Sequence, residues 1–174
     1  LSSLLRWGTV LPAYLALVFY RNTGRVCAES RIFKRPEELK HVGDYRALVI
    51  ARLEYGSTSG SRFKAIRDLT KEADGLDLAP FVRCGGNFKK QILMNHLFIG
   101  PMVREINRMI VEKAKTFKPD IVWIDKGYQV WAGTLKELKR SSPQMLVHFS
   151  PDNQKIVGNQ SYHYLMSIPH YDVH

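Results

Sequence analysis

Three short apolar runs stand out along the chain. They are ALVIARLE (Ala47–Glu54), DIVWID (Asp120–Asp125) and QMLVHF (Gln144–Phe149), and polar or glycine-containing residues follow each of them. A run of strand length that is apolar at nearly every position is typical of a β-strand buried on both faces. The pattern therefore predicts three strands of a parallel sheet.

Apolar residues at helical spacing fill the segments beside these runs. Helices are predicted over residues 62–73, 100–118, 131–140 and 161–168. In the first, Phe63, Ile66 and Leu69 repeat at helical spacing, and the second begins where Gly100 and Pro101 suit a first helical turn. The stretch 74–98 has a weak pattern, within which we expect a short strand in 76–84.

The alternation of strands and helices sets the fold class. Each parallel crossover must traverse the sheet and is normally helical, so the order predicts an α/β, Rossmann-like doubly wound parallel sheet with helices on both faces. We expect residues 44–174 to form this domain and residues 1–43 to form an apolar and basic appendage. The chain starts at Leu1 rather than Met and stops on YDVH, where a strand begins, so we interpret it as a fragment truncated at the C-terminal side.

The appendage contains an apolar stretch, Trp7–Tyr20, with arginines at its edges. Its fourteen residues fall short of the roughly 18 to 20 that a membrane-spanning helix needs. Three interpretations remain: a helix packed on the core or on a partner, an interfacial anchor giving peripheral membrane contact through residues 1–25, and a signal sequence.

Charge and cysteine content narrow the setting. Twenty-six Lys and Arg against sixteen Asp and Glu give a net charge of +10, which favours anionic ligands such as phosphates, nucleic acid or acidic lipids. The chain has two cysteines, Cys27 and Cys84, without the spacing of a disulfide framework or a zinc site. These features favour a reducing, cytoplasmic location.

The loops that follow the three predicted strands are the candidate site, because ligands of open parallel sheets bind outside the carboxyl ends of the strands. The candidate residues facing substrate or phosphate are Gly56, Ser57, Thr58, Ser59, Gly60, Ser61, Arg62, Asp125, Lys126, Gly127, Ser150, Asp152 and Asn153.

The first of these loops, Gly56–Ser61, precedes a predicted helix, so its backbone N–H groups and hydroxyls can converge on a phosphate. It matches neither the dinucleotide fingerprint nor the Walker loop. The alternative is a plain connection with Ser61 as the helix N-cap.

The second and third loops carry carboxylates. Asp125 and Lys126 together suit a substrate hydroxyl, while Gly127 allows close approach of a ligand to the backbone; a solvated turn is the alternative. Asp152 is the one candidate for a general base, if it lies within reach of an acceptor hydroxyl. The alternative here is an Asx turn formed by Asp152 and Asn153.

The histidines do not point to a metal. His148 lies within a predicted strand, where a lone histidine is more often structural than catalytic, and His163, His170 and His174 lack a surrounding ligand motif. No DxD pattern occurs either. We therefore expect no metal and no cofactor.

The motifs PDIVWIDKG, TLKELK, MLVHFSPDN and NQSYHYLMSIPHYDVH, in this order, resemble those of spore-maturation-protein-like glycosyltransferases. The similarity covers about Ala47–His174. It implies a GT-B fold, in which two Rossmann-like domains face a cleft and this chain supplies the N-terminal, acceptor-side one. Gly56–Ser61 would face the donor phosphates, and Asp152 would be the first acidic residue of a paired motif, whose second position here is Asn153.

The resemblance implies an enzyme that transfers a sugar from a nucleotide sugar, its donor substrate, to a hydroxyl acceptor. This chain alone would be incomplete without the C-terminal domain as partner. The alternative is a non-catalytic Rossmann-like regulatory module that binds nucleotide or nucleic acid. We do not expect nucleic acid, because no recognised nucleic-acid motif is present.

Overall fold

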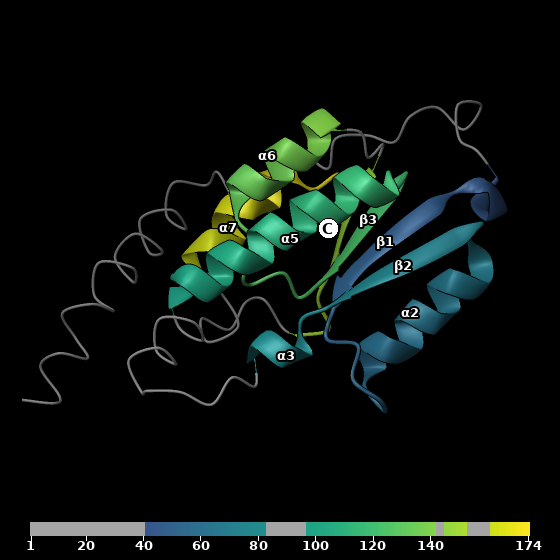
Figure 1. Cartoon of the computed structure of the whole chain (residues 1–174), viewed down its shortest axis with the longest axis horizontal. Coiled ribbons are helices and arrows are strands. Elements are labelled where there is room, and N and C mark those ends of the chain that lie inside the picture. The colour runs from purple at the N-terminus through teal and green to yellow at the C-terminus, as the bar shows by residue number, and fades with distance from the viewer. Residues whose placement is uncertain (1–40, 83–96, 142–144, 153–160) are drawn as a thin grey trace, which may run out of the picture. The chain divides into compact units, whose positions relative to one another are not determined.

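A parallel sheet organises the computed structural model, which describes residues 41–82, 97–141, 145–152 and 161–174 (Figure 1). Its strands are β1 (Arg46–Ala51), β2 (Glu72–Asp77), β3 (Ile121–Asp125) and β4 (Met145–Phe149). They form a four-stranded sheet in the order β2-β1-β3-β4, and all three pairings are parallel. The predicted fold class is therefore confirmed as a parallel α/β sheet flanked by helices.

The strand order creates a switch point between β1 and β3. The chain passes from β1 to β2 on one side and then returns to β3 and β4 on the other. The crevice at such a switch point, at the carboxyl ends of the strands, is where open α/β sheets bind ligands. Beyond β4, Val173 forms a single parallel bridge with Val147, at the place where the sequence predicts another strand.

Helices cover both faces of this sheet. They are α2 (Thr58–Leu69), α3 (Ala79–Val82), α5 (Pro101–Phe117), α6 (Ala132–Ser141) and α7 (Tyr162–Ser167), with 3-10 turns η2 (Val42–Asp44) and η5 (Ile168–His170). Gly75 and Leu76 are adjacent in β2, so they face opposite sides. A Cβ on Gly75 would meet Phe63 of α2, whereas Leu76 packs in a cluster with α5. The helices α2 and α5 thus lie on opposite faces.

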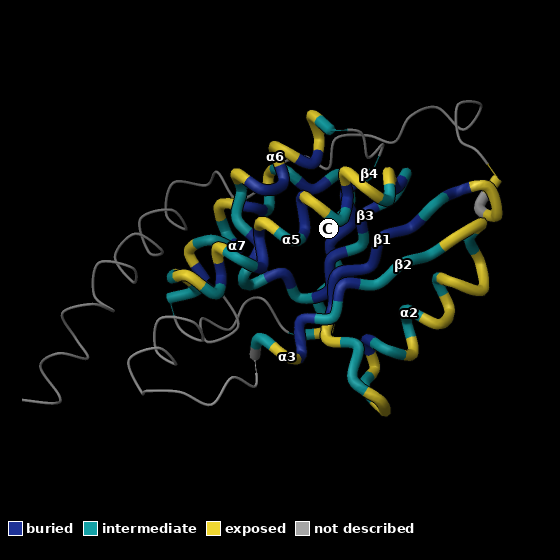
Figure 2. The backbone as a smooth tube through the Cα atoms, in the orientation of Figure 1, coloured by how far each residue is buried: buried dark blue, intermediate teal, exposed yellow. Residues whose placement is uncertain are grey.

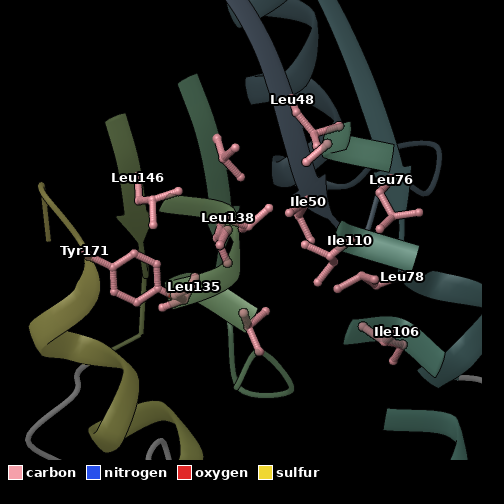
Figure 3. Close-up of a cluster of buried hydrophobic side chains, with 14 of the residues drawn as sticks. Leu48, Ile50, Leu76, Leu78, Ile106, Ile110, Leu135, Leu138, Leu146 and Tyr171 are labelled. Carbon is pink, nitrogen blue, oxygen red and sulfur yellow. The ribbon is translucent and has the colours of Figure 1, made fainter. Parts of the chain in front are cut away.

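The main core lies between the sheet and α5 and α6. Figure 2 shows β1 buried along most of its length, and residues Ala47 to Ala51 are all buried. Figure 3 shows side chains from the strands and helices meeting in one cluster. Its members include Leu48, Ile50, Leu76, Ile106, Ile110, Leu135, Leu138, Leu146 and Tyr171. This apolar contact fixes the strands, and with them the loops at their carboxyl ends.

The bounds of α2 and β2 differ clearly from the sequence prediction. The helix predicted over 62–73 is α2, which begins at Thr58 and ends at Leu69. Its N-cap is Ser57, whose hydroxyl accepts from the Gly60 N–H, so the alternative with Ser61 as N-cap is wrong. Thr58–Ser61, the larger part of the predicted loop, is thus helical, because Ser57 supplies a cap one turn earlier. On the same helix, Leu69 is 63% exposed, so the predicted apolar face ends before it.

The strand β2 also lies earlier than predicted, since 79–82 forms the short helix α3 within the expected 76–84 strand. Its sequence EADGLD is polar and lies at the edge of the described sheet, where an apolar run is not required. The Gly75 N–H donates to Asp74 Oδ1, and the Gly75 carbonyl accepts from Lys113 Nζ at 2.8 Å. Lys113 also pairs with Asp74 at 3.0 Å.

Several predictions fall outside the described residues. The apolar stretch Trp7–Tyr20, the membrane contact through residues 1–25 and the boundary at residue 43 stay predictions, since residues 1–40 are not described. Within the described ranges, no helix combines the length and apolar character needed to cross a bilayer. These ranges hold fifteen Lys and Arg against thirteen Asp and Glu, so most of the excess of +10 belongs to the other segments.

Candidate functional site

Side chains from all three candidate loops meet at the carboxyl edge of β1, β3 and β4. Arg62, in the second turn of α2, reaches across to Asp125 at the end of β3, with 2.7 Å between Nη2 and Oδ2. Lys126 Nζ pairs with Asp152 Oδ2, just beyond β4, at 2.9 Å. The fold therefore joins residues that lie up to 63 positions apart in sequence.

Asp125 is buried, with only 2% of its side chain exposed. Both Arg62 Nε, at 3.2 Å, and Nη2 donate to the same oxygen, Oδ2. The other oxygen, Oδ1, is buried and has no hydrogen-bond partner in the described part of the chain. A buried carboxylate oxygen without a donor is costly, so this arrangement is an exception that calls for an explanation.

Two further contacts hold the Arg62 guanidinium. Its carbon lies 4.5 Å from the centre of the Phe149 ring, and Phe149 itself stacks on Trp123. Nη2 also donates to the Ser59 hydroxyl at 3.3 Å. Aromatic stacking suits the planar guanidinium and leaves its edge to form hydrogen bonds. Arg62 thus links α2, β3 and β4.

Asp152 accepts two hydrogen bonds at its Oδ2. Besides Lys126, the Tyr128 hydroxyl donates to it at 2.9 Å. The hydrogen bond from Lys126 is the main cause that lowers the pKa of Asp152 below its ordinary value, and the Tyr128 hydrogen bond acts in the same direction. Asp152 is therefore ionised near neutral pH and poorly suited to accept a proton.

A left-handed turn directs Lys126 toward Asp152. Lys126 and Gly127 have φ angles of 66° and 64°, a region that costs a non-glycine residue roughly 1 kcal/mol. The backbone is held by the Lys126 N–H, which donates to the Phe149 carbonyl at 2.8 Å, and by His148 Nε2, 3.0 Å from the Lys126 carbonyl. A Cβ on Gly127 would lie 3.0 Å from Ile124 and 3.1 Å from the Tyr171 hydroxyl, so a glycine is required there for two reasons.

The first candidate loop forms the start of α2. The Ser57 N–H donates to the Glu54 carbonyl, and Gly56 has a φ of 76°, as a glycine in a tight turn does. The Ser57 hydroxyl caps the helix, and the Ser61 hydroxyl points back to the Ser57 carbonyl at 3.4 Å. The amide N–H groups of Thr58 and Ser59 donate to no acceptor among the described residues. These first-turn amides can therefore receive an anion.

The third candidate loop is described only as far as Asp152. Its backbone N–H donates to the Ser150 hydroxyl at 3.4 Å, a local turn contact of the kind expected for these residues. Asn153, the second residue of the predicted pair, lies outside the described residues.

Sequence reasoning missed Tyr128 as a partner of Asp152 and Phe149 as the platform for Arg62. His148 is structural, as expected: it is 3% exposed and its ring lies within 5.1 Å of the Tyr164 and Tyr171 rings. Burial lowers its pKa to about 4. The sequence did hold a signal for Tyr128, because it follows the DKG turn directly and so lies at the same edge of the sheet as the candidate loops.

Among the described residues, no three His, Cys, Asp or Glu side chains gather as the ligands of a metal ion would. Comparison of the chain with known protein families, with curated proteins and with solved structures finds no match. The interpretation of the site therefore depends on its geometry and on the sequence motifs.

Proposed function

We propose that this chain contains the acceptor-side domain of a GT-B glycosyltransferase that transfers a sugar from a nucleotide sugar to a hydroxyl acceptor. The observation that carries the proposal is the convergence of three candidate loops at one sheet edge, through the pairs Arg62–Asp125 and Lys126–Asp152. The motifs that carry the resemblance include the second and third of these loops, and the β1–β3 switch point is the expected ligand position of a parallel sheet.

The first turn of α2 supports a role in holding the donor phosphates. The amide N–H groups of Thr58 and Ser59, which have no acceptor among the described residues, lie at the positive end of a 12-residue helix. In a transfer reaction the leaving diphosphate gains charge, and fixed N–H donors aimed at that charge lower the barrier. We therefore assign leaving-group stabilisation to this turn.

Asp152 suits the acceptor side in a binding role. Its lowered pKa makes it a weak base, whereas a general base is tuned toward the working pH. An ionised carboxylate can accept a hydrogen bond from an acceptor hydroxyl and orient it. Lys126 and Tyr128 would keep the carboxylate in place.

The test uses the full-length product of the native gene with a panel of nucleoside-diphosphate sugars. The release of nucleoside diphosphate is measured with and without an extract that supplies acceptors. We expect acceptor-dependent release from one donor, and a loss of roughly 100-fold or more in kcat/KM for Asp152→Asn, the size that a lost positioning group produces. The matched control is Lys136→Met on the exposed side of α6, which should retain the activity.

Two outcomes would contradict the proposal. No release from any donor by the folded protein would remove the enzyme assignment, and nucleotide binding without release would favour the regulatory module. Equal loss in Asp152→Asn and Lys136→Met would show that the effect does not come from the sheet edge.

A further inference from the structure

The contacts of Arg62 do not use all of its hydrogen-bond donors. Nε and Nη2 donate to Asp125 and Ser59, but Nη1 donates to no acceptor among the described residues. Arginine favours carboxylates through two parallel hydrogen bonds to two oxygens. Here Asp125 offers one oxygen only, and its Oδ1 is left buried and without a donor. The ion pair is therefore weaker than a paired fork would be.

Arg62 also lies on the same face of α2 as the first-turn residues Thr58 and Ser59, whose N–H groups have no acceptor among the described residues. It follows Thr58 and Ser59 by four and three positions, the spacing of helical neighbours, and its hydrogen bond to the Ser59 hydroxyl confirms their proximity. A quarter of the Arg62 side chain is exposed, so a ligand can reach it. The free donors here are Nη1 and two backbone amides, which together match the oxygens of a phosphate group.

We infer that Arg62 and the first turn of α2 form a diphosphate-binding site in which the Asp125 carboxylate competes with the ligand for Arg62. In the unliganded protein, Asp125 neutralises the guanidinium and lowers the affinity for anions. A diphosphate draws Arg62 toward the Thr58 and Ser59 amides. The inference rests on the proposed function only in the identity of the ligand, the diphosphate of a nucleotide sugar.

The competition has an uncommon consequence. Removal of a carboxylate that contacts a binding residue usually weakens a site by loosening it. At this site, Asp125→Asn removes the competing charge, keeps the shape of the side chain and frees Arg62. Affinity for a diphosphate should therefore rise.

Inorganic pyrophosphate is the probe, and its binding to the full chain is measured by titration calorimetry. We expect Asp125→Asn to bind pyrophosphate at least about tenfold more tightly than the unsubstituted chain, because a buried carboxylate that loses its partner costs more than an exposed ion pair contributes. Arg62→Gln should bind it more weakly by a similar factor, and the double variant should match Arg62→Gln. The control is Arg67→Gln on the exposed side of the same helix, which should not change the affinity.

Equal or weaker binding by Asp125→Asn, or unchanged binding by Arg62→Gln, would overturn the inference. If Asp125→Asn does not fold, as far-ultraviolet circular dichroism would reveal, the unsubstituted chain still provides a test. The Nε–Hε nuclear magnetic resonance signal of Arg62, identified by its loss in Arg62→Gln, should shift on addition of pyrophosphate. A signal that stays in place at saturation would also overturn it.

This test is separate from that of the proposed function. Pyrophosphate binding with the expected pattern, in a protein without sugar transfer, would keep the site and remove the enzyme assignment. Sugar transfer without the affinity gain in Asp125→Asn would keep the enzyme and remove the competition.

Discussion

At the scale of single residues, His148 shows how a buried side chain holds the site without entering it. The Lys126 carbonyl only accepts hydrogen bonds, so His148 Nε2 carries the proton and donates. Because burial lowers the pKa of His148, its Nδ1 is unprotonated near neutral pH and accepts from His174 Nδ1, 2.8 Å away. His174 Nε2 is left to accept from the Tyr164 hydroxyl at 3.5 Å. Protonation of His148 would reverse the direction of its bond to His174.

The neutrality of His148 predicts a loss of stability in acid. Burial is the main cause that lowers its pKa from 6.5 to about 4, so the unfolded chain binds more protons than the folded one between these values. The stability that the folded state keeps by holding His148 neutral is complete above pH 6.5 and is lost as the pH falls toward 4. We expect the free energy of unfolding to be about 2 kcal/mol lower at pH 5 than at pH 7.5 from this residue. Urea unfolding at both pH values measures it.

His148→Gln is the control for this prediction, because it keeps an N–H donor for the Lys126 carbonyl and cannot titrate. His163, His170 and His174, whose pKa values are also lowered by burial, remain in the variant. The pH dependence should shrink in His148→Gln. An unchanged dependence would assign the effect to the other histidines.

Residue identity at the site was predictable from the sequence, but the pairing was not. Asp125 and Lys126 are adjacent, and the sequence predicts that they act together. In the structure they separate, because Asp125 belongs to the strand face that meets Arg62, whereas the left-handed turn sends Lys126 toward Asp152. A single left-handed lysine carries no signal in the sequence, so this division needs the fold.

At the scale of elements, Gly75 allows α2 to pack closely on β2. A Cβ at this position would lie 2.5 Å from Leu53 Cδ1 and 3.2 Å from Phe63 Cζ. Gly75→Ala should therefore lower the free energy of unfolding by about 1 to 3 kcal/mol, the usual cost of overpacking. Gly133→Ala is the matched control, since a Cβ there meets nothing within 4 Å and Gly133 lies in helix α6.

The control should behave in the opposite way. Alanine in place of glycine in a helix stabilises by roughly 0.5 to 1 kcal/mol, so the two variants should differ in sign when both are measured by urea unfolding. A neutral Gly75→Ala would mean that Leu53 can move aside at little cost.

Asn107 joins α5 to the segment that leads from β3 to α6. Its Nδ2 donates to the Val103 and Gln129 carbonyls, and its Oδ1 accepts from the Trp131 N–H and the Thr134 hydroxyl. The side chain is 4% exposed, and all four of its hydrogen bonds are made within the protein. It thereby anchors the chain that leaves the DKG turn.

Asn107→Ala should lower the free energy of unfolding by about 2 to 4 kcal/mol, because it leaves buried partners without hydrogen bonds. Thr116→Ala on the same helix is the control; its hydroxyl bonds only to the Glu112 carbonyl of its own helix, and the change should stay within about 0.5 kcal/mol. Chemical denaturation compares the two. Similar losses in both variants would contradict the role of Asn107.

The elements that the sequence predicted correctly have strong periodic or continuous patterns. The helix α5 combines Pro101 at its start with a long apolar face, and β1, β3 and β4 are apolar runs with no exposed residue. The strand β2 was misplaced because its polar residues resemble a loop. The start of α2 was misplaced because Ser57 and Ser61 are equally good caps by residue type.

At the scale of the whole molecule, neither the strand order nor the distribution of charge could be predicted. Three apolar runs predict a parallel sheet, but only the pairing of β1 with both β2 and β3 creates the switch point. The net charge of +10 implied a basic surface, yet the described ranges are nearly balanced in charge. The described residues therefore have too little net charge to attract polyanions in general, and they favour the binding of an anion at one localised site.

The outer edge of β2 has a consequence for how copies of the protein meet. An open strand edge offers peptide groups on which a strand of another molecule can align, and this is a common start of aggregation. At the middle of this edge, the Gly75 peptide groups already bond to Asp74 and Lys113. Charged side chains also line this strand, with Glu72 paired to Arg46 and Asp74 paired to Lys113, and charged groups on an edge strand disfavour pairing with another copy. The polar sequence that made β2 look like a loop thus also disfavours the pairing of another strand at this edge of the described sheet.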